Sequence, residues 1–301
     1  MATVETAFEQ IITPVTHDLG AFKVNRTLPS RPRTMVGPFI FVDEFGPARL
    51  PAGGGMDVRP HPHINLATVT YLFDGAIRHR DSIGSDAVIE PGAINLMTAG
   101  SGIVHSERSP QDLRADGPNL YGMQTWLALP DGKEEVDPAF DHVPAAMLPT
   151  VEDNGVRARV LMGDLWGVLA ATPQHSPTIY ADIELDAGGA IPIDAEADER
   201  AVMIVGGEAE LDGQPLDLFT LYILRPGHAA RLSSEGGGRV MLMGGQAFAT
   251  PRHVFWNFVS SSRDRINQAK EDWKAQRFAT IPGDDEEFIP LPEVPITVSY
   301  P

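Results

Sequence analysis

The chain has 301 residues, which is long enough for two domains that each bury a hydrophobic core. It carries 41 acidic against 23 basic residues, and this formal net charge of −18 argues against direct binding to nucleic acid or to an anionic membrane. It contains no cysteine, which excludes disulfides, thiolate metal ligands and redox-active thiols.

Hydrophobic residues make up 43% of the chain, and its 29 glycines and 26 prolines are typical of a β protein with many turns. The first residues lack the basic region and apolar core of a secretory signal. No apolar run approaches the roughly 18 residues of a membrane span. We therefore expect a cytoplasmic protein without a membrane segment.

Short strands are predicted between residues 60 and 107. Residues 66–73 are rich in β-branched and aromatic side chains, and residues 76–82 form an alternating segment. Turn signals interrupt the region at short intervals: Asp74-Gly75, Gly84-Ser85-Asp86, Pro91-Gly92 and Gly100-Ser101-Gly102. This spacing of turns indicates an all-β sandwich or barrel.

Two clusters in this region carry the chemistry, His61-Pro62-His63 and His105-Ser106-Glu107. Strand side chains alternate between two faces, so both ends of each triplet point to the same side. Two such strands facing each other in a barrel aim three imidazoles and one carboxylate at a common point. That donor set suits non-haem iron or another redox-active or borderline divalent metal. We predict one such ion per chain.

Plainer interpretations exist for each of these residues. His61 and His63 could be turn histidines at the rim of a barrel, and Glu107 could be an outer carboxylate or a general base rather than a ligand. We expect His79 to belong to a hairpin strand or turn rather than to the metal site. The remaining histidines have no second ligand at metal spacing: His17, His142, His175, His228 and His253.

The second half of the chain repeats the pattern of strands and turns without the ligands. Aligning Gly75 with Gly207, and Pro91-Gly92 with Pro226-Gly227, gives apolar residues at all four ligand positions: Ile193, Ala195, Val240 and Leu242. Apolar positions cannot hold a metal but favour a dry, packed barrel. We expect a metal-binding barrel over residues 1–140 and a barrel without metal over residues 150–301.

The last part of the chain changes from a strand pattern to a helix pattern. Ser261 or Ser262 can cap a helix there. Apolar residues that share one face of this helix are Ile266, Ala269 and Trp273. A polar, acidic loop over residues 282–287 follows it.

Several segments together resemble the pirin family of the cupin superfamily. They are Val36–Phe45, Pro60–His63, Thr68–Leu72, Met97–Glu107 and Gly122–Trp126. The resemblance is dense over residues 20–130 and looser to about residue 275. It implies a bicupin, that is, two double-stranded β-helix (jelly-roll-like) barrels packed together, with the short helix at the C-terminal end. It also implies Fe(II) ligands at His61, His63, His105 and Glu107.

The resemblance implies two classes of function. In the first, the protein is an Fe(II)-dependent dioxygenase, an oxidoreductase similar to quercetin 2,3-dioxygenases, which cleaves a flavonol or another enediol or aromatic small molecule. Glu107 then ligates the metal and accepts the proton of the substrate hydroxyl. In the second class, the protein is a non-enzymatic regulator whose iron oxidation state alters a surface that binds a protein partner. Fold alone cannot choose, because cupins host many unrelated reactions.

One segment departs from the family pattern. Pirins commonly continue the His-Pro-His triplet with Arg-Gly-Phe-Glu, whereas Ile64-Asn65-Leu66-Ala67 stands here. If this segment continues the strand of His61 and His63, some of its side chains line the cavity beside the metal. Loss of two charged residues there predicts weak cleavage of polyphenols, whose buried hydroxyls need hydrogen-bond partners.

Overall fold

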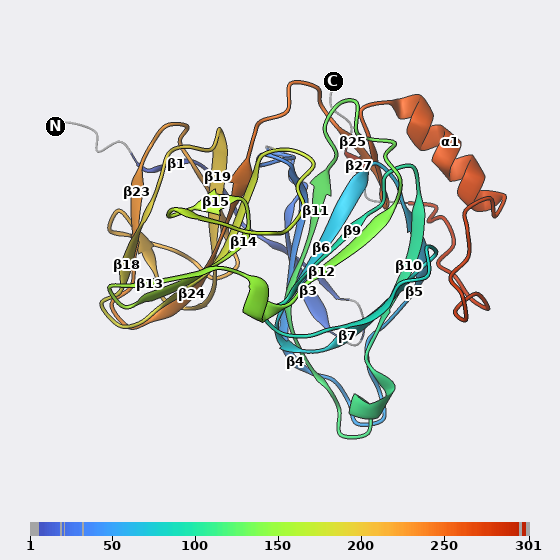
Figure 1. Cartoon of the computed structure of the whole chain (residues 1–301), viewed down its shortest axis with the longest axis horizontal. Coiled ribbons are helices and arrows are strands. Elements are labelled where there is room, and N and C mark those ends of the chain that lie inside the picture. The colour runs from blue at the N-terminus through green and yellow to red at the C-terminus, as the bar shows by residue number, and fades with distance from the viewer. Residues whose placement is uncertain (1–5, 19, 21, 32, 295–296, 299–301) are drawn as a thin grey trace. The chain divides into compact units, whose positions relative to one another are not determined.

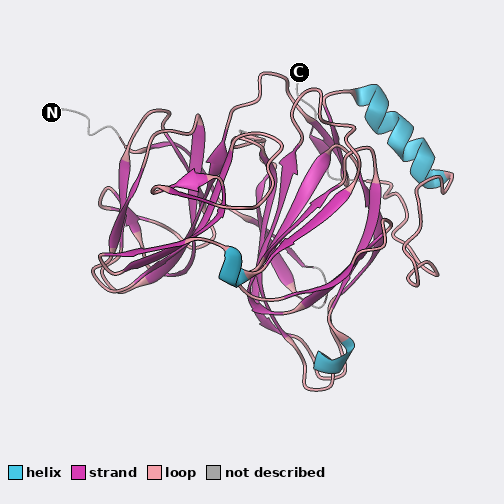
Figure 2. Ribbon diagram, viewed as in Figure 1, coloured by secondary structure: helices cyan, strands magenta, loops and turns pink. Residues whose placement is uncertain are grey.

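Strands dominate the structure, a computed structural model that describes residues 6–18, 20, 22–31, 33–294 and 297–298 (Figure 1). Within these residues there is a single α-helix, α1 (Arg263–Lys274), and two short 3-10 helices, η1 (Gln111–Leu113) and η2 (Ala145–Met147) (Figure 2). The expected all-β class with a short C-terminal helix is confirmed. None of the helices in the described part of the chain combines the length and apolarity needed to cross a membrane.

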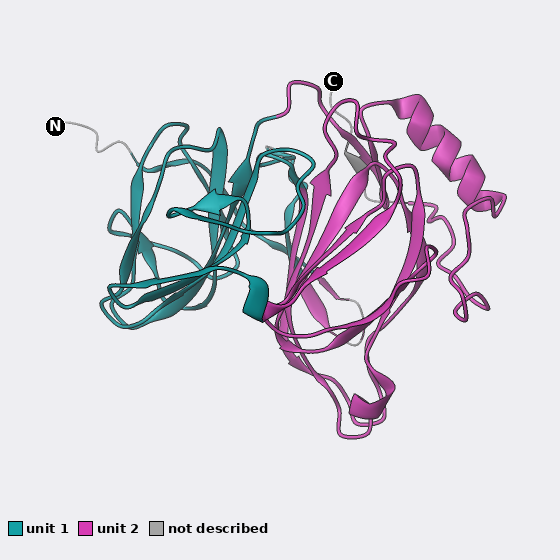
Figure 3. Cartoon of the chain, viewed as in Figure 1, with its two compact units in different colours: residues 1–16, 25–39, 146–247 teal, residues 17–24, 40–145, 248–301 magenta. Residues whose placement is uncertain are grey.

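Two compact units make up the chain (Figure 3). Unit 1 contains Met1–Thr16, Asn25–Phe39 and Ala146–Ala247, and unit 2 contains His17–Val24, Ile40–Ala145 and Phe248–Pro301. These units differ from the expected division into residues 1–140 and 150–301, since each takes up a terminal segment from the other half of the chain.

Strand pairing explains why the N-terminal segment belongs to unit 1. Its strand β1 (Phe8–Ile12) pairs with β22 (Leu221–Leu224), where Ile12 lies opposite Leu221. Phe8 is buried in the apolar core of this unit, with its ring 4.9 Å from that of Tyr222. The sheet order of unit 1 is therefore β1-β22-β19-β24-β17-β14-β13 for seven strands and β18-β23-β20-β21 for four.

The remaining strands of unit 1 have the following bounds: β13 (Thr150–Asp153), β14 (Val156–Met162), β15 (Asp164–Leu165), β16 (Val168–Leu169), β17 (Thr178–Leu185), β18 (Ala190–Ile193), β19 (Glu199–Gly207), β20 (Glu210–Leu211), β21 (Gln214–Pro215), β23 (Ala230–Ser233) and β24 (Gly238–Gly245). Strands β15 and β16 form a separate hairpin. Side chains from both larger sheets form one apolar core. That burial accounts for most of the stability a β-barrel of this size needs.

Three further sheets, most of whose residues belong to unit 2, are ordered β12-β9-β6-β11-β4-β3-β2, β5-β10-β7-β8 and β26-β25-β27. Their strands have these bounds: β2 (Val15–Asp18), β3 (Lys23–Leu28), β4 (Phe39–Arg49), β5 (Asp57–His63), β6 (Leu66–Gly75), β7 (Ile77–Asp81), β8 (Asp86–Ile89), β9 (Ile94–Thr98), β10 (Ile103–Arg108), β11 (Asn119–Ala128), β12 (Ala139–Val143), β25 (His253–Phe255), β26 (Phe258–Ser260) and β27 (Thr297–Val298). The four-stranded sheet carries both predicted ligand clusters.

Helix α1 belongs to unit 2 and begins where the sequence predicts. The hydroxyl oxygen of Ser262 accepts a hydrogen bond from the backbone N–H of Arg265, which caps the helix. The three residues expected on one face are buried, and they pack in an apolar cluster with Ile64, Val104 and Phe258. The predicted helix is confirmed.

The internal duplication is present, but its alignment requires a correction. Strands β5-β10-β7-β8 and β18-β23-β20-β21 have the same order, with Pro62 opposite Val104 and Pro192 opposite Arg231. By this register, His61 and His63 correspond to Ile191 and Ile193, and His105 corresponds to Leu232. These three apolar residues are all buried.

The predicted alignment failed because its two Pro-Gly turns are not equivalent. The first, Pro91-Gly92, precedes β9, whereas Pro226-Gly227 follows β22, which takes the place of β9. Val240 and Leu242 therefore lie on β24, which takes the place of β11. Ala195 lies beyond the end of β18 and is half-buried.

Candidate metal centre

Strands β5 and β10 bring the three predicted histidines together inside unit 2. They pair antiparallel, and His105 lies directly opposite His61. The Nε2 atoms of His63 and His105 are 3.1 Å apart, and ligand atoms of all three imidazoles lie within 4.8 Å of one another. All three side chains are buried.

Backbone carbonyls fix the tautomers of the two β5 histidines. His61 donates its Nδ1–H to the carbonyl of Arg59 at 2.8 Å, and His63 donates its Nδ1–H to the carbonyl of Asn257 at 3.1 Å. A neutral imidazole carries one proton, so in both rings Nε2 holds a free lone pair. This is the arrangement that metal-ligating histidines usually have.

A chain of three side chains fixes the tautomer of His105. Asp81 Oδ2 accepts the Nε2–H of His79 at 3.1 Å, which leaves His79 Nδ1 as an acceptor for the Nδ1–H of His105 at 3.5 Å. The Nε2 of His105 then also carries a lone pair. Burial favours protonation of Asp81, but hydrogen bonds from His79 and Ser85 lower the pKa of its carboxyl overall, so it remains an acceptor.

His79 lies on a hairpin strand, as expected, since β7 pairs with β8, but it also belongs to the buried histidine cluster. The side chain is buried and its ring stacks on Phe140, with centroids 4.4 Å apart. Strand β7 pairs with β10 so that Glu107 lies opposite His79, and Asp81 lies opposite His105. The spacing His79-x-Asp81 was the available signal, because it puts both side chains on one strand face.

Glu107 belongs to the same cluster, but it is grouped with His79 and His105 rather than with His61 and His63. Its carboxylate groups with His79 and His105 within 4.8 Å, and Thr70 Oγ1 lies 3.5 Å from its Oε1. The ladder between β10 and β5 shifts register between His105 and Glu107. The structure therefore places all four predicted residues around one buried region, with His79 as a fifth member.

Burial sets the charge state of the cluster. It lowers the pKa of His61 to about 4, and together with neighbouring imidazoles it lowers the pKa of His63 and the pKa of His105 well below the ordinary value. Burial also raises the pKa of the Glu107 carboxyl. The three imidazoles are therefore neutral at neutral pH, which is the form that binds a metal.

The facing Nε2 atoms are a direct test of whether a metal fits. Two lone pairs at 3.1 Å cannot hydrogen-bond to each other, and the Nδ1 protons are already committed to other acceptors. Two nitrogens bound at right angles to one ion, each at about 2.1 Å, lie about 3.0 Å apart. The residues present therefore fit a divalent cation.

Aromatic side chains form a dry wall beside the histidines. The ring of Trp126 meets that of His63 edge to face at 5.1 Å and stacks on Phe41 at 4.0 Å. Next to it on β11, the half-buried Gln124 accepts a hydrogen bond from Thr70 at 2.8 Å. A low-dielectric wall of this kind strengthens electrostatic interactions within the cluster.

In the segment that departs from the family pattern, the two positions that are charged in pirins, Ile64 and Ala67, do not face this cluster. Strand β5 ends at His63, and Asn65 has a left-handed backbone, φ 56°, that turns the chain. Ile64 faces Phe258 and α1. Ala67 and Thr70 are three residues apart on β6, so their side chains point to opposite faces of that strand. Leu66, by contrast, shares the face of β6 that carries Thr70. The argument for weak polyphenol cleavage rested on Ile64 and Ala67, and it loses its basis because neither of these two side chains faces the cluster.

We expect Ile64→Ala to reduce stability by about 2–3 kcal/mol without changing metal affinity. The substitution removes buried methyl groups from the cluster beneath α1, and such losses typically cost this much. Denaturant unfolding and a metal titration of the same preparation measure the two quantities. A large loss of metal affinity at unchanged stability would contradict this prediction and show that Ile64 lines the metal site.

Comparison with known proteins agrees with this architecture. A family model described as Pirin matches residues 21–127, and one described as the Pirin C-terminal cupin domain matches residues 180–279. A Pirin-like protein of Caulobacter vibrioides is 48% identical over 279 residues, 92% of this chain and 96% of that protein. A Pseudomonas aeruginosa protein provisionally named a quercetin 2,3-dioxygenase is 36% identical over 280 residues, 92% of this chain and 87% of that protein.

A solved structure extends the likeness to three dimensions. The crystal structure of a quercetin 2,3-dioxygenase from Acinetobacter baumannii matches with a TM-score of 0.89 and 34% identity, and the match covers 97% of both chains. The two β units are thus the two barrels of a bicupin. With matches in both halves and 48% identity to a pirin-like protein, the chain belongs to the pirin family.

Proposed function

We propose that this pirin binds one Fe(II) ion in unit 2 and is a dioxygenase for a flavonol-type or other enediol substrate. The observation that carries the proposal is the convergence of three buried imidazoles, in which Nε2 of His63 faces Nε2 of His105 at 3.1 Å while the Nδ1 atoms of His61 and His63 are committed to backbone carbonyls. The names of the Pseudomonas and Acinetobacter relatives support the substrate class.

The donor set suits iron or another borderline divalent ion and argues against a structural zinc site. His61, His63, His105 and Glu107 provide neutral imidazoles and a carboxylate, without the thiolates that structural zinc sites commonly use. Four protein ligands leave coordination positions open for small molecules. When bound, Fe(II) supplies the redox chemistry that a reaction with dioxygen requires.

The side chains around the site have distinct tasks in this proposal. Glu107 accepts the proton of the substrate hydroxyl, and its raised pKa brings the carboxyl closer to that task. The Thr70 and Gln124 pair offers hydrogen-bonding groups to a substrate hydroxyl, and Gln124 reaches partly exposed surface. Asp81 and His79 keep His105 in the metal-binding tautomer.

Oxygen consumption tests this proposal directly. The protein is loaded with iron under anaerobic conditions and mixed with a panel of flavonols and simpler enediols in an oxygen electrode. We expect uptake with at least one compound, and none above background with the His63→Ala variant. A protein that holds one iron per chain and consumes no oxygen with any compound contradicts the enzymatic proposal and favours the regulator with a protein partner.

A further inference from the structure

A loop after α1 lies against the strands that carry the metal cluster. It comprises residues 281–289 and is anchored at one end by the buried side chain of Ile281. At the other end, Trp273 of α1 donates its Nε1–H to the carbonyl of Ile289 at 3.0 Å. In Figure 1 it is part of the orange-red segment that follows α1 beside β5 and β10.

This loop bonds to each of the three strands β5, β7 and β10. The N–H of Ile289 donates to the carbonyl of Pro60 at 2.8 Å, and Arg80 Nη1 donates to the carbonyl of Gly283 at 3.1 Å. On β10, both Ser106 and Arg108 donate to Asp284.

Each strand residue bonded by the loop is the immediate neighbour of a cluster residue. Pro60 precedes His61, Arg80 lies between His79 and Asp81, and Ser106 and Arg108 flank Glu107. Because strand side chains alternate, those of Arg80, Ser106 and Arg108 point away from the face that holds the metal cluster. The loop therefore contacts these three strands on the outside of the barrel, while the same strands present the candidate ligands to the inside.

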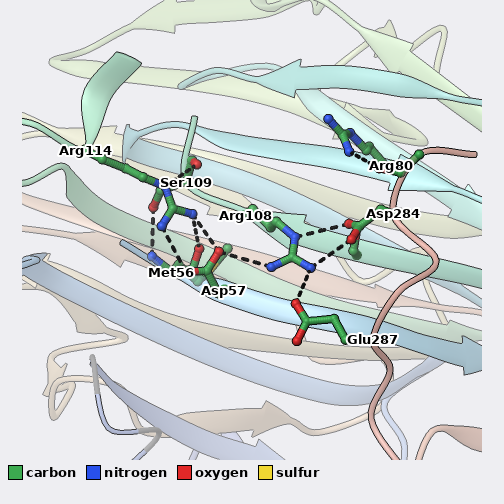
Figure 4. Close-up of polar contacts among 10 residues, drawn as sticks. Met56, Asp57, Arg80, Arg108, Ser109, Arg114, Asp284 and Glu287 are labelled. Carbon is green, nitrogen blue, oxygen red and sulfur yellow. Dashed lines mark hydrogen bonds and ion pairs between the residues drawn. The ribbon is translucent and has the colours of Figure 1, made fainter. Parts of the chain in front are cut away.

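Asp284 makes the strongest of these contacts. Its Oδ2 accepts hydrogen bonds from Ser106 Oγ at 2.7 Å and Arg108 Nε at 3.1 Å, and its Oδ1 accepts one from Arg108 Nη2 at 2.9 Å. The Asp284 side chain is only 11% exposed, so water screens this paired contact little. Arg108 is held further by Glu287 at 2.9 Å and by Asp57 at 3.3 Å (Figure 4).

The contact falls where the ladder between β5 and β10 is irregular. Between the His105–His61 and Glu107–Val58 pairs, two steps along β10 match three along β5, so β5 carries a bulge and Ser106 of β10 lies opposite it, whereas β10 pairs regularly with β7. A bulge interrupts the ladder on its side, so β10 between His105 and Glu107 is supported less by β5 than by β7. The hydroxyl of Ser106 is held instead by Asp284.

We propose that Asp284 is a positioning residue, which holds β10 from outside the barrel where the bulge of β5 interrupts their ladder and so keeps His105 and Glu107 in the geometry that metal binding requires. This inference rests on the metal site of the proposed function. Asp284 touches neither ligand, so it acts only through Ser106 and Arg108.

Cobalt(II) is a suitable probe because its absorption spectrum reports coordination geometry. The parent, Asp284→Ala, Asp284→Asn and Asp285→Asn are titrated with Co(II) in competition with a chelator, and their spectra are compared. Asp285 is the matched control, since this neighbouring carboxylate is exposed and makes no hydrogen bond or ion pair to the described residues.

We expect Asp284→Ala to bind Co(II) about 10-fold more weakly, at the lower end of the roughly 10–100-fold cost of losing an outer partner, and with an altered spectrum. Asp284→Asn keeps an acceptor for Ser106 and should lose less affinity. Asp285→Asn should match the parent. If Asp284→Ala does not fold, the comparison of Asp284→Asn with Asp285→Asn decides.

Parent-like affinity and spectrum in folded Asp284 variants overturn the inference, even if their melting temperatures fall, because a purely structural role predicts that result. A parent that binds no Co(II) overturns the proposed metal site and this inference with it. A parent that binds Co(II), with Asp284 variants that bind it equally well, overturns this inference alone.

Discussion

His105→Ala is expected to abolish stoichiometric metal binding while the β-sheet fold persists. His105 faces His63 across 3.1 Å and also groups with His79 and Glu107, so its loss removes the imidazole that both sets share. Loss of a direct ligand should reduce affinity by more than about 100-fold, beyond the roughly 10–100-fold typical of outer partners. Metal analysis after dialysis measures the stoichiometry, and circular dichroism checks the fold.

His228→Ala is the matched control for this experiment. His228 is paired with Asp212 at 2.8 Å in unit 1, whereas all predicted ligands belong to unit 2. This variant should retain one metal per chain. Full metal content in His105→Ala, or two ions per chain in the parent, would refute the assignment.

Ile193→Asp is expected to destabilise the protein by roughly 3–5 kcal/mol, the cost of a buried charge without a partner. Ile193 is 1% exposed in the core of unit 1, at the position that His63 takes in unit 2. The apolar core cluster that contains Ile193 also includes Leu232 and Val240, whose side chains offer no hydrogen bond to a carboxylate. The shift in the denaturant unfolding midpoint measures the loss.

The control for this substitution is Leu169→Asp in the same unit. Leu169 is 69% exposed on β16, so a carboxylate there remains in water and should change stability by less than about 0.5 kcal/mol. Equal losses in both variants would mean that the effect comes from added negative charge. An Ile193→Asp protein as stable as the parent would show that this barrel interior is not closely packed.

Local patterns in the sequence predicted the strands, the helix and the histidines of the candidate metal centre. The triplets at His61 and His105 follow from strand alternation, which depends only on adjacent residues. The helix cap at Ser262 is equally local, since it joins residues three apart. The pairing of the two triplets depended on the resemblance to pirins and on the barrel it implies.

Features that depend on register between distant strands were not predicted. Nothing near His79 in the sequence shows that β7 pairs with β10 and brings His79 to His105. The left-handed backbone of Asn65 is likewise fixed by its amide Nδ2, which donates to the carbonyl of Glu134 and to the carboxylate of Glu135, at 2.7 and 2.6 Å. Without those partners, a continuous strand through Ile64 was the natural expectation.

The exchange of terminal segments between the two units has a consequence for biosynthesis. The carbonyl that fixes the tautomer of His63 belongs to Asn257, and the Asp284 contact to β10 comes later still. A ribosome adds roughly 5–20 residues per second, so both ligand strands emerge many seconds before these groups exist. The nascent barrel can collapse early, but its histidines are set for metal only after residues 257–284 have been synthesised. Metal loading is therefore expected to follow synthesis of this segment, and a fragment ending near residue 140 should not acquire the ion.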